Sequence, residues 1–306
     1  MAKILIATEK PFAKVAVDGI KEVAETAGLE IVLLEKYTEK AQLLAAVADV
    51  EAMIIRSDKI DNEVFDAAKN LKIVVRAGAG YDNVDLAAAT AHGVVVMNTP
   101  GQNSNAVAEL VFGMLVFAVR NFYNGKAGTE LKGKKLGILA YGNVGRRVAH
   151  IAKGFDMDVY AYDAYCPAAA IESDGVKAVS SQDELFEKCE VVSLHIPATA
   201  ETRQSINYAL VDKMPKGGVL VNTARKEVIN EPELLKLMQE RTDLKYVTDI
   251  MPEADADFRI LEGRYFSTPK KMGAQTAEAN INAGVAAAHQ IAAFFKDGCT
   301  KYQVNK

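Results

Sequence analysis

The chain has few of the features that mark disulfide-bonded, metal-binding or secreted proteins. Its three cysteines (Cys166, Cys189 and Cys299) are far apart and form no C-x-x-C pair, so neither a disulfide framework nor a zinc site is expected. The first residues, MAKILIATEK, have no long apolar segment of the kind found in signal peptides. These absences predict a cytoplasmic protein without a structural metal.

Long hydrophobic runs are also missing. The longest, LVFGMLVFAV, covers residues 110–119, whereas a membrane-spanning helix needs about 20 apolar residues. A helix this apolar is typically buried on nearly every side, in a core or at a subunit interface. We expect a helix over residues 105–122 that forms a homodimer contact, because so much apolar surface is seldom left in water. Burial inside a single chain is the alternative.

The chain lacks a strong net charge as well. Its 36 basic and 40 acidic residues give a formal charge of −4, which argues against nucleic acid or an anionic membrane as the main partner. With 50% hydrophobic and 25% charged residues, the composition is that of an ordinary globular protein. The length of 306 residues predicts about two domains.

Strand-like and helix-like segments alternate along the chain. Strand candidates in the first part are residues 4–8, 30–35, 52–57, 73–77 and 94–98. After a Gly/Lys-rich connector at 124–135, further candidates lie at 136–139, 191–196, 218–223, 246–250 and 265–268, followed by a helical run at 277–296. This order predicts an α/β fold with two Rossmann-like domains, each built on a parallel sheet.

Residues 135–165 have the order strand, glycine turn, helix and strand of a dinucleotide-binding unit. The turn reads A-x-G-x-x-G, with Ala140 in the place of the usual first glycine. Gly142 would let the backbone approach a pyrophosphate, and Gly145 would let the helix pack close to the strand. The free N–H groups at the start of the helix would bind the phosphates.

The acid after the turn predicts which nicotinamide cofactor binds. Asp163 ends the second strand and would accept hydrogen bonds from both ribose hydroxyls of the adenosine. Its charge would repel the 2′-phosphate of NADP, and neither Ala164 nor Tyr165 supplies a cation to offset it. NAD is therefore the expected cofactor. His195, at the end of another strand candidate, is expected at the same crevice, beyond the carboxyl ends of the strands.

Six segments of the chain carry motifs that occur together, in this order, in one known family. They are RAGAGYDNVDL (76–86), VVMNTPGQN followed by VAEL (95–110), the glycine turn, VVSLHIPATAETR (191–203), GGVLVNTAR (217–225) and TPKKMGAQTAEA (268–279). Over nearly its whole length the chain thus resembles the D-isomer-specific 2-hydroxyacid dehydrogenases. Within that family it is most similar to the members that oxidise D-3-phosphoglycerate, in a short form without a C-terminal regulatory domain.

The resemblance implies a domain plan and a set of site residues. A substrate-binding domain of residues 1–100 would be completed by 280–306, residues 101–279 would bind NAD, and the active site would lie in the cleft between them. Arg225 would bind the substrate carboxylate and carbonyl oxygen through its forked guanidinium. Further substrate contacts would be Ser57, the backbone N–H groups of Gly78, Ala79 and Gly80, and Asn103, for which a helix cap is the alternative. Cofactor contacts would be Tyr141, Gly142, Asn143, Val144, Asp163, His195, Pro197, Thr202, Thr223, Ala224, Asp249 and Gly273.

The chain departs from the family pattern at the acid/base. The family has a histidine in TPHxG, paired with a glutamate, whereas this chain has TPKKMG. Counting back from Gly273 puts Lys271 in the histidine's place, and counting forward from Pro269 gives Lys270. Glu253, kept as a catalytic candidate, lies one residue short of the glutamate's place. A lysine, with an ordinary pKa of about 10.4, needs no carboxylate to stay protonated, so it would replace the pair, as in a lysine-type subgroup of the family.

The implied reaction is the NAD-dependent oxidation of D-3-phosphoglycerate to 3-phosphohydroxypyruvate, the first step of serine biosynthesis. Lys271 would exchange the hydroxyl proton, and Arg225 would orient the substrate. Arg56 and Arg76 each lie at the carboxyl end of a strand candidate of the first domain and are expected to bind the substrate phosphate. The alternatives are a dehydrogenase for another D-2-hydroxy acid, such as glycerate or its keto form hydroxypyruvate, and an NAD-sensing corepressor that binds partner proteins.

Overall fold

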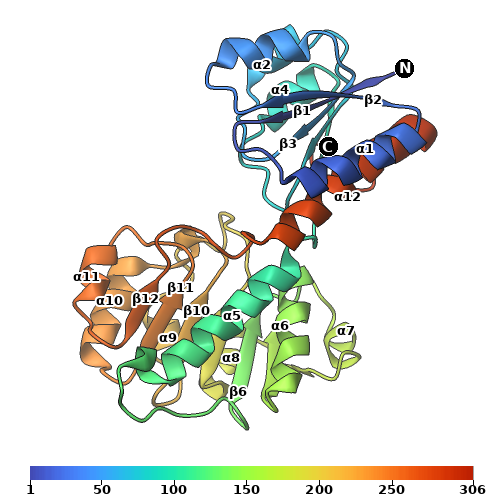
Figure 1. Cartoon of the computed structure of the whole chain (residues 1–306). Helices are drawn as coiled ribbons and strands as arrows, with labels where there is room; N and C mark the ends of the chain where they lie inside the picture. The colour runs from blue at the N-terminus through green and yellow to red at the C-terminus, as the bar shows by residue number, and fades with distance from the viewer. Residues whose placement is uncertain (306) are drawn as a thin grey trace. The chain divides into compact units, whose positions relative to one another are not determined.

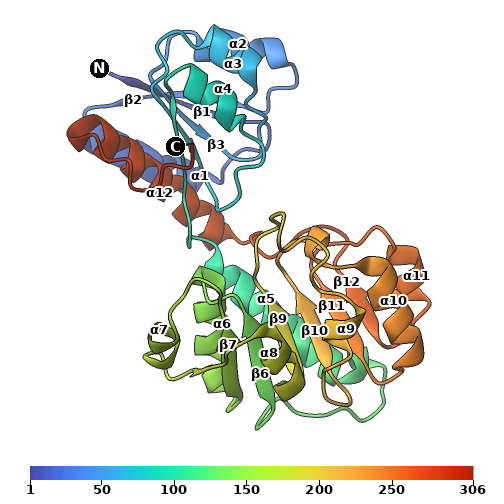
Figure 2. The same ribbon diagram turned by 180° about the vertical axis from the view of Figure 1, so that it is seen from behind.

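The computed structural model describes residues 1–305 and contains two compact units, each with its own parallel sheet (Figures 1 and 2). The N-terminal unit comprises residues 1–103 together with the segment from Thr276 onward, and the central unit comprises residues 104–275. The sequence had placed these boundaries near residues 100 and 280. The predicted α/β fold with two parallel sheets is confirmed.

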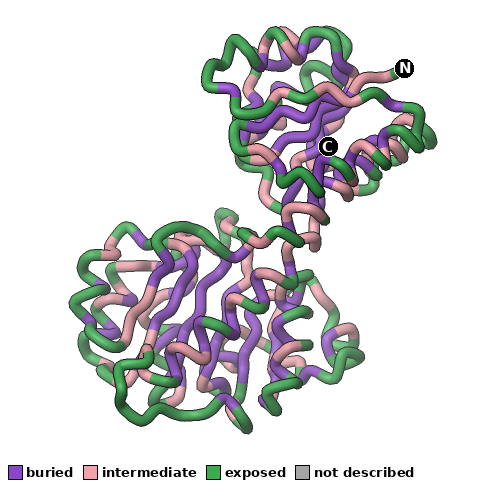
Figure 3. The backbone as a smooth tube through the Cα atoms, in the orientation of Figure 1, coloured by how far each residue is buried: buried purple, intermediate pink, exposed green. Residues whose placement is uncertain are grey.

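The N-terminal unit has a five-stranded sheet in the order β2-β1-β3-β4-β5. Its strands are β1 (Lys3–Thr8), β2 (Glu30–Glu35), β3 (Ala52–Ile55), β4 (Ile73–Arg76) and β5 (Val95–Asn98). One face is covered by α1 (Lys14–Thr26) and α12 (Ala277–Asp297), which lie side by side, and the other by α2 (Lys40–Val47), α3 (Asn62–Ala67) and α4 (Leu86–Ala91). Helices on both faces explain why β3, with the sequence AMII, is buried along its whole length (Figure 3).

The last helix and the tail after it are integral to the N-terminal unit. Thr276 caps α12 by accepting a hydrogen bond from the N–H of Ala279, and Gly298 ends the helix in the left-handed conformation. The tail then runs along the outer edge of β5. There the side chain of Asn305 accepts a hydrogen bond from the N–H of Val96 and donates one to the carbonyl oxygen of Val94, both at 2.8 Å. The edge strand thereby gains backbone partners that it would otherwise lack.

The central unit has a seven-stranded sheet in the order β12-β11-β10-β9-β6-β7-β8. Its strands are β6 (Lys135–Leu139), β7 (Asp158–Tyr162), β8 (Lys177–Ala178), β9 (Val191–Leu194), β10 (Val219–Asn222), β11 (Lys245–Thr248) and β12 (Tyr265–Ser267). Its helices are α5 (Ser104–Val119), α6 (Asn143–Gly154), α7 (Ala168–Glu172), α8 (Gln182–Lys188), α9 (Tyr208–Val211), α10 (Glu231–Glu240) and α11 (Asp255–Arg259), with 3₁₀ turns η1 (Asn121–Tyr123) and η2 (Lys226–Val228). The strand order reverses at β6, and open parallel sheets bind their ligands beyond the carboxyl ends at such a point.

Helix α5 contains the longest apolar run of the sequence and lies with α6 on one face of the central sheet (Figure 1). Its apolar residues from Val107 to Val119 are mostly buried within the central unit, where Phe112 also stacks on Phe155. Burial in the unit's own core therefore accounts for much of the run, and a homodimer through this helix stays a prediction. Every helix within residues 1–305 is too short or too polar to cross a lipid bilayer.

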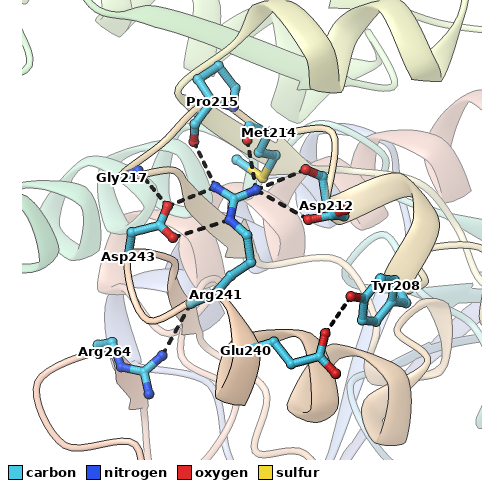
Figure 4. Close-up of polar contacts among 9 residues, drawn as sticks. All are labelled: Tyr208, Asp212, Met214, Pro215, Gly217, Glu240, Arg241, Asp243 and Arg264. Carbon is cyan, nitrogen blue, oxygen red and sulfur yellow. Dashed lines mark hydrogen bonds and ion pairs between the residues drawn. The ribbon is translucent and has the colours of Figure 1, made fainter.

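A partly buried arginine, Arg241, connects the loops at the amino end of the central sheet through hydrogen bonds (Figure 4). Arg241, directly after α10, donates to the carbonyl oxygens of Asp212 and Met214 and forms a 2.7 Å ion pair with Asp243. Asp243 in turn accepts a hydrogen bond from the N–H of Gly217. Because carbonyl groups and the carboxylates of Asp212 and Asp243 surround the guanidinium, this arginine has a structural role and is not a ligand-binding candidate.

Candidate active site

The predicted cofactor residues of the central unit follow the carboxyl ends of its strands. Because all neighbouring strands are parallel, these ends lie along one edge of the sheet. The turn at 140–142 follows β6, Asp163 follows β7, His195 follows β9, Thr223 follows β10 and Asp249 follows β11. The structure therefore brings residues that are spread over more than a hundred positions of sequence to one edge.

The glycine turn after β6 has three differently constrained positions. Ala140 has a φ of 76°, in the region that favours glycine, so the methyl group in the first position is tolerated with backbone strain. A Cβ on Gly145 would lie 2.4 Å from the carbonyl oxygen of Ala140, so the close packing of helix and strand requires this glycine. A Cβ on Gly142 would meet no described atom within 4 Å. Gly142 and the neighbouring Asn143 are exposed, and this open backbone at the start of α6 fits the pyrophosphate of a dinucleotide.

Asp163 holds the same turn through its carboxylate. It accepts hydrogen bonds from the backbone N–H groups of Tyr141 at 2.6 Å, Tyr165 at 2.7 Å and Cys166 at 2.8 Å. Burial pushes the pKa of Asp163 upward, but these N–H donors and the charge of Arg146 outweigh it, and the pKa lies below its ordinary value. The group is therefore an anion at neutral pH, as the predicted preference for NAD over NADP requires.

His195 lies at the carboxyl end of β9 as a neutral imidazole. Burial lowers its pKa to about 3. Its Nε2 is 2.9 Å from the hydroxyl of the fully buried Ser193, which had not been predicted as a site residue. In the loop that follows, the Thr202 hydroxyl donates to the carbonyl oxygen of Pro197 and accepts from the N–H of Thr199. Two predicted cofactor residues, Pro197 and Thr202, are thus joined in one closed loop.

Asp249 and Thr223 end neighbouring strands and leave buried oxygen atoms without a protein partner. Asp249 Oδ2 accepts a 2.7 Å hydrogen bond from the N–H of Gly273, whereas Asp249 Oδ1 and Thr223 Oγ1 have no partner among residues 1–305. Burial raises the pKa of Asp249, and the N–H of Gly273 and the charge of Lys271 oppose the rise only in part. Buried polar atoms are normally hydrogen-bonded, so these two oxygens fit the polar group of a bound cofactor.

Arg225 and Lys271 converge on a single carbonyl group. The Nζ of Lys271 and the Nη1 of Arg225 each donate a 2.9 Å hydrogen bond to the carbonyl oxygen of Ala224. The loop that presents them is shaped by Asn222, which is fully buried and hydrogen-bonds through its side chain to the N–H of Ala224 and the carbonyl oxygen of Arg225. Asn222 was not predicted as a site residue, although a polar residue ending the apolar strand VLVN was a signal for it.

The two other acid/base candidates lie differently. Lys270 is exposed, and its carbonyl oxygen accepts a hydrogen bond from the hydroxyl of Thr268, which shapes the turn. The Glu253 carboxylate is mostly exposed and forms a 2.9 Å ion pair with Lys226, which lowers its pKa. Lys271 interacts electrostatically with Asp249. Residues 1–305 contain no cluster of three or more His, Cys, Asp or Glu side chains arranged to hold a metal ion.

In the N-terminal unit, Arg56 makes several contacts within the fold. Its Nη1 donates to the carbonyl oxygens of Lys10 at 2.9 Å and Pro11 at 3.1 Å, and its Nη2 donates to Asn280 Oδ1 at 2.7 Å. Its guanidinium also lies over the ring of Phe12. Three of the five N–H donors are therefore engaged by the β1–α1 loop and α12.

The predicted substrate loop of the N-terminal unit, residues 78–80, is hydrogen-bonded to the carboxyl end of β5. The Asn98 side chain donates a 2.6 Å hydrogen bond to the carbonyl oxygen of Ala79, and the N–H of Thr99 donates to that of Gly78. Gly78 has a φ of 147°, and a Cβ there would overlap the guanidinium of Arg76. The structure thus places Arg76 against the loop 78–80. Ser57 is exposed and Asn103 half-buried.

Comparison with known proteins identifies the family of the chain. The family model described as "D-isomer specific 2-hydroxyacid dehydrogenase, NAD binding domain" matches residues 113–265. The solved structure of NAD⁺-bound 3-phosphoglycerate dehydrogenase from Entamoeba histolytica is similar over 100% of this chain and 99% of its own, with 49% identity and a TM-score of 0.89.

Two curated relatives have different names. Hydroxypyruvate reductase of Thermotoga maritima is 34% identical over 86% of this chain and 90% of its own length. D-3-phosphoglycerate dehydrogenase of Methanocaldococcus jannaschii is 33% identical over 95% of this chain, and this chain spans 57% of the length of that relative. The similarity therefore supports one family and more than one substrate.

Proposed function

Since the chain belongs to the D-isomer-specific 2-hydroxyacid dehydrogenases and uses NAD, we propose that its substrate is D-3-phosphoglycerate, oxidised at C2 to 3-phosphohydroxypyruvate. The observation that carries the proposal is the convergence of Arg225 and Lys271 on the Ala224 carbonyl. The Arg225 guanidinium can bind a carboxylate and a carbonyl oxygen, and the Lys271 amine can exchange a proton with the substrate. When bound, the nicotinamide ring supplies the acceptor for the C2 hydride.

The proton of the C2 hydroxyl is assigned to Lys271. Its hydrogen bond to Ala224 directs the ammonium toward Arg225, the residue that would hold the oxygen atom being deprotonated. Both lysines are exposed residues, and the contact of Lys271 Nζ with the carbonyl oxygen of Ala224 is what distinguishes it from Lys270. The contact thus supports the count back from Gly273, which gives Lys271. Gly273 is itself anchored by a hydrogen bond from its N–H to Asp249.

Glu253 is assigned no proton transfer. Its carboxylate is paired with Lys226 and is 81% exposed, whereas the buried Asp249 interacts electrostatically with Lys271. A lysine needs no carboxylate to keep its proton at neutral pH. This agrees with a reaction in which one lysine replaces a histidine and glutamate pair.

The cofactor is assigned to the glycine turn and the strand ends beside it. Gly142 and Asn143 would hold the pyrophosphate, and Asp163 the adenosine ribose. The unpartnered oxygens of Thr223 and Asp249 would hold the carboxamide of the nicotinamide. His195 would line the same site, and as a neutral imidazole it would add no charge there.

The substrate phosphate is assigned chiefly to Arg76. Its guanidinium lies against Gly78 in the loop that would bind the substrate carboxylate, and its Nε donates a 3.0 Å hydrogen bond to the carbonyl oxygen of Arg56. Arg56 follows the neighbouring strand and keeps its place as the second phosphate candidate, with three donors on Lys10, Pro11 and Asn280. Arg76→Ala should lower kcat/KM for D-3-phosphoglycerate far more than for D-glycerate. Arg56→Ala should lower the melting temperature as well, because it disconnects the β1–α1 loop from α12. If each variant lowered kcat/KM equally for D-3-phosphoglycerate and D-glycerate, the assignment of the phosphate to these arginines would be wrong.

A different 2-hydroxy acid is the second candidate, because the hydroxypyruvate reductase of Thermotoga maritima is as similar as the phosphoglycerate dehydrogenases of the curated set. NADH formation should be measured with D-3-phosphoglycerate, D-glycerate and D-lactate, and NADH consumption with the matching keto acids. We expect the highest kcat/KM with D-3-phosphoglycerate. A higher value with D-glycerate or hydroxypyruvate would contradict the proposed substrate and keep the enzyme class.

The same assay separates the enzyme from a corepressor-like NAD-binding protein. A protein that only senses NAD would bind the cofactor and show no turnover with any acid of the panel. The contacts of Arg225 and Lys271 favour the enzyme, since a sensor has no use for a substrate fork beside a proton donor.

A further inference from the structure

The N-terminal unit contains a cavity that the proposed reaction does not use. It has a volume of about 300 Å³ and lies where the end of β5, the second half of α12 and the tail after α12 meet. Ligand sites in proteins start at about this volume and combine apolar walls with a few polar groups. None of the residues assigned above to substrate or cofactor lines it.

The lining divides into an apolar part and a polar rim. Met97, Ala286, Ala293 and the ring of Tyr302 form most of the apolar surface. The rim carries Lys301, whose ammonium lies 5.3 Å from the centre of the Tyr302 ring. His289, an exposed residue of α12, adds a ring nitrogen to the same rim. The chain thus offers a cation beside an apolar surface, and none of the residues lining the cavity is acidic.

One lining residue connects the cavity to the substrate loop. Gln290 donates a 3.0 Å hydrogen bond from Nε2 to the carbonyl oxygen of Asn98, and the Asn98 side chain donates to the carbonyl oxygen of Ala79. Gln290 Oε1 is buried and has no partner among residues 1–305, so the amide is held at one end only. A molecule in the cavity would contact the residue that supports Asn98.

We propose that this cavity binds a small organic carboxylate with an apolar body and that its occupant weakens substrate binding through Gln290 and Asn98. The carboxylate would pair with Lys301, and the apolar body would fill the space between Met97 and Tyr302. A carboxylate oxygen that accepts from Gln290 Nε2 would compete with the carbonyl oxygen of Asn98 for this donor, and would so weaken the support of Ala79. The coupling rests on the proposed role of the loop 78–80 in substrate binding, whereas the binding site does not.

Binding is tested with 3-phenylpropionate and its uncharged amide as probes. The methyl resonance of Met97, identified by its loss in Met97→Leu, should shift with the acid and respond at least about fivefold more weakly to the amide. A ligand of this size is expected to bind with a dissociation constant of about 1 mM. No shift of Met97 at concentrations well above that value would overturn the site.

Three variants locate the probe. Ala286→Phe fills the cavity and should abolish the Met97 shift, and Lys301→Gln should weaken binding about fivefold or more by removing the cation. Lys296→Gln, which removes an exposed lysine of α12 that does not line the cavity, is the matched control and should leave binding unchanged. Equal losses in Lys301→Gln and Lys296→Gln would show that only the overall charge matters, and would contradict a site at Lys301.

The coupling is tested by kinetics. The acid should raise the KM for the 2-hydroxy acid severalfold and leave kcat unchanged. Gln290→Leu should raise KM by itself, still bind the probe, and show no further increase when the probe is added. Binding without any change in KM would overturn the coupling and keep the site. Absence of turnover with every 2-hydroxy acid would instead contradict the proposed function, while the Met97 titration would still decide the cavity.

Discussion

Lys271 and Arg225 donate to the same acceptor, the carbonyl oxygen of Ala224, each at 2.9 Å. The two cations therefore lie within two hydrogen-bond lengths of each other. Like charges this close repel, and the shared carbonyl oxygen and the charge of Asp249 each offset part of that repulsion. An alkoxide or carboxylate oxygen of a substrate would relieve the same repulsion, which is why this pair marks the point where the substrate oxygen would bind.

Lys271→Ala should reduce turnover about 100-fold or more, the usual size of a general acid/base contribution, and leave NAD affinity intact. Only the neutral amine accepts a proton, so the oxidation rate should climb through the alkaline range, toward the ordinary lysine pKa of about 10.4. Reduction of the keto acid needs the ammonium and should hold at neutral pH. Steady-state rates in both directions from pH 6 to pH 10 provide the measurement.

Lys270→Ala is the matched control for this prediction, since it removes the adjacent lysine of the same loop. It should change turnover only slightly and keep the alkaline rise. Loss of turnover in Lys270→Ala with retention in Lys271→Ala would reverse the assignment. Near-normal rates in both variants would contradict a lysine mechanism altogether.

Asp163→Ser should reduce the preference for NAD over NADP. The carboxylate that would repel a 2′-phosphate is lost, and the pKa below the ordinary value shows that this group is charged at neutral pH. Because the same carboxylate accepts from Tyr141, Tyr165 and Cys166, the variant should also melt at a lower temperature. The ratio of kcat/KM for the two cofactors is the quantity to measure.

Asp174→Asn is the control for the structural part of this effect. Asp174 accepts a hydrogen bond from the Tyr141 hydroxyl and pairs with Arg146, so its loss loosens the same turn. The cofactor ratio should stay unchanged in this variant. A similar change in the ratio would mean that loosening the turn, and not the charge of Asp163, alters the preference.

Residues close in sequence to a strand end were predictable, and residues whose role depends on distant partners were not. The strand, turn, helix and acid of the nucleotide unit follow from local periodicity and spacing, so the sequence alone made Gly142, Gly145 and Asp163 candidates. Arg56 was assigned to phosphate because it follows a strand, and no sequence pattern reveals that Asn280, 224 positions away, takes one of its donors.

The register of the lysine loop was beyond the sequence for a related reason. Counting from either side of TPKKMG gives a different lysine. The structure shows that Gly273 is anchored by a hydrogen bond from its N–H to buried Asp249, which the sequence could not show, and the choice of Lys271 stays a prediction. The apolar run of α5 was likewise visible as a buried helix, but the surface that covers it was not, since periodicity does not distinguish a core from an interface. Ser193 and Asn222 were missed because the role of a buried polar residue is recognised only from its hydrogen-bond partner, which the sequence does not show.

Acidification should destabilise the protein partly through His195. In the unfolded chain the imidazole takes up a proton near its ordinary pKa of 6.5, whereas burial lowers the folded pKa to about 3. Between these values the unfolded state binds more protons, so unfolding becomes easier as the pH falls. The contribution of a neutral His195 is therefore complete above pH 6.5 and is lost progressively toward pH 3.

The measurement is urea unfolding at pH 7, 6 and 5 for the unchanged protein and for His195→Gln, whose side chain still offers an acceptor to the Ser193 hydroxyl and does not titrate. The unchanged protein should lose more free energy of unfolding from pH 7 to pH 5 than the variant does. Equal losses would show that the folded protein protonates His195 as readily as the unfolded chain does.

The glycine turn should separate stability from cofactor binding in two single substitutions. Gly145→Ala places a methyl group 2.4 Å from the carbonyl oxygen of Ala140, so α6 must move away from β6, at a cost of about 1–3 kcal/mol of unfolding free energy. Gly142→Ala meets no described atom, and φ at this position is −81°, which any residue adopts. Its stability should be unchanged or higher by about 0.5 kcal/mol, because alanine restricts the unfolded chain.

Gly142→Ala should weaken NAD binding although it does not lower the stability of the protein. A methyl group there occupies the space assigned to the pyrophosphate, so Gly142→Ala should bind NAD at least about tenfold more weakly while melting at or above the original temperature. Calorimetric titration with NAD and thermal unfolding without it give the two quantities independently. Unchanged NAD affinity in a well-folded Gly142→Ala would mean that the pyrophosphate does not approach this backbone, since no atom of the protein itself requires the glycine.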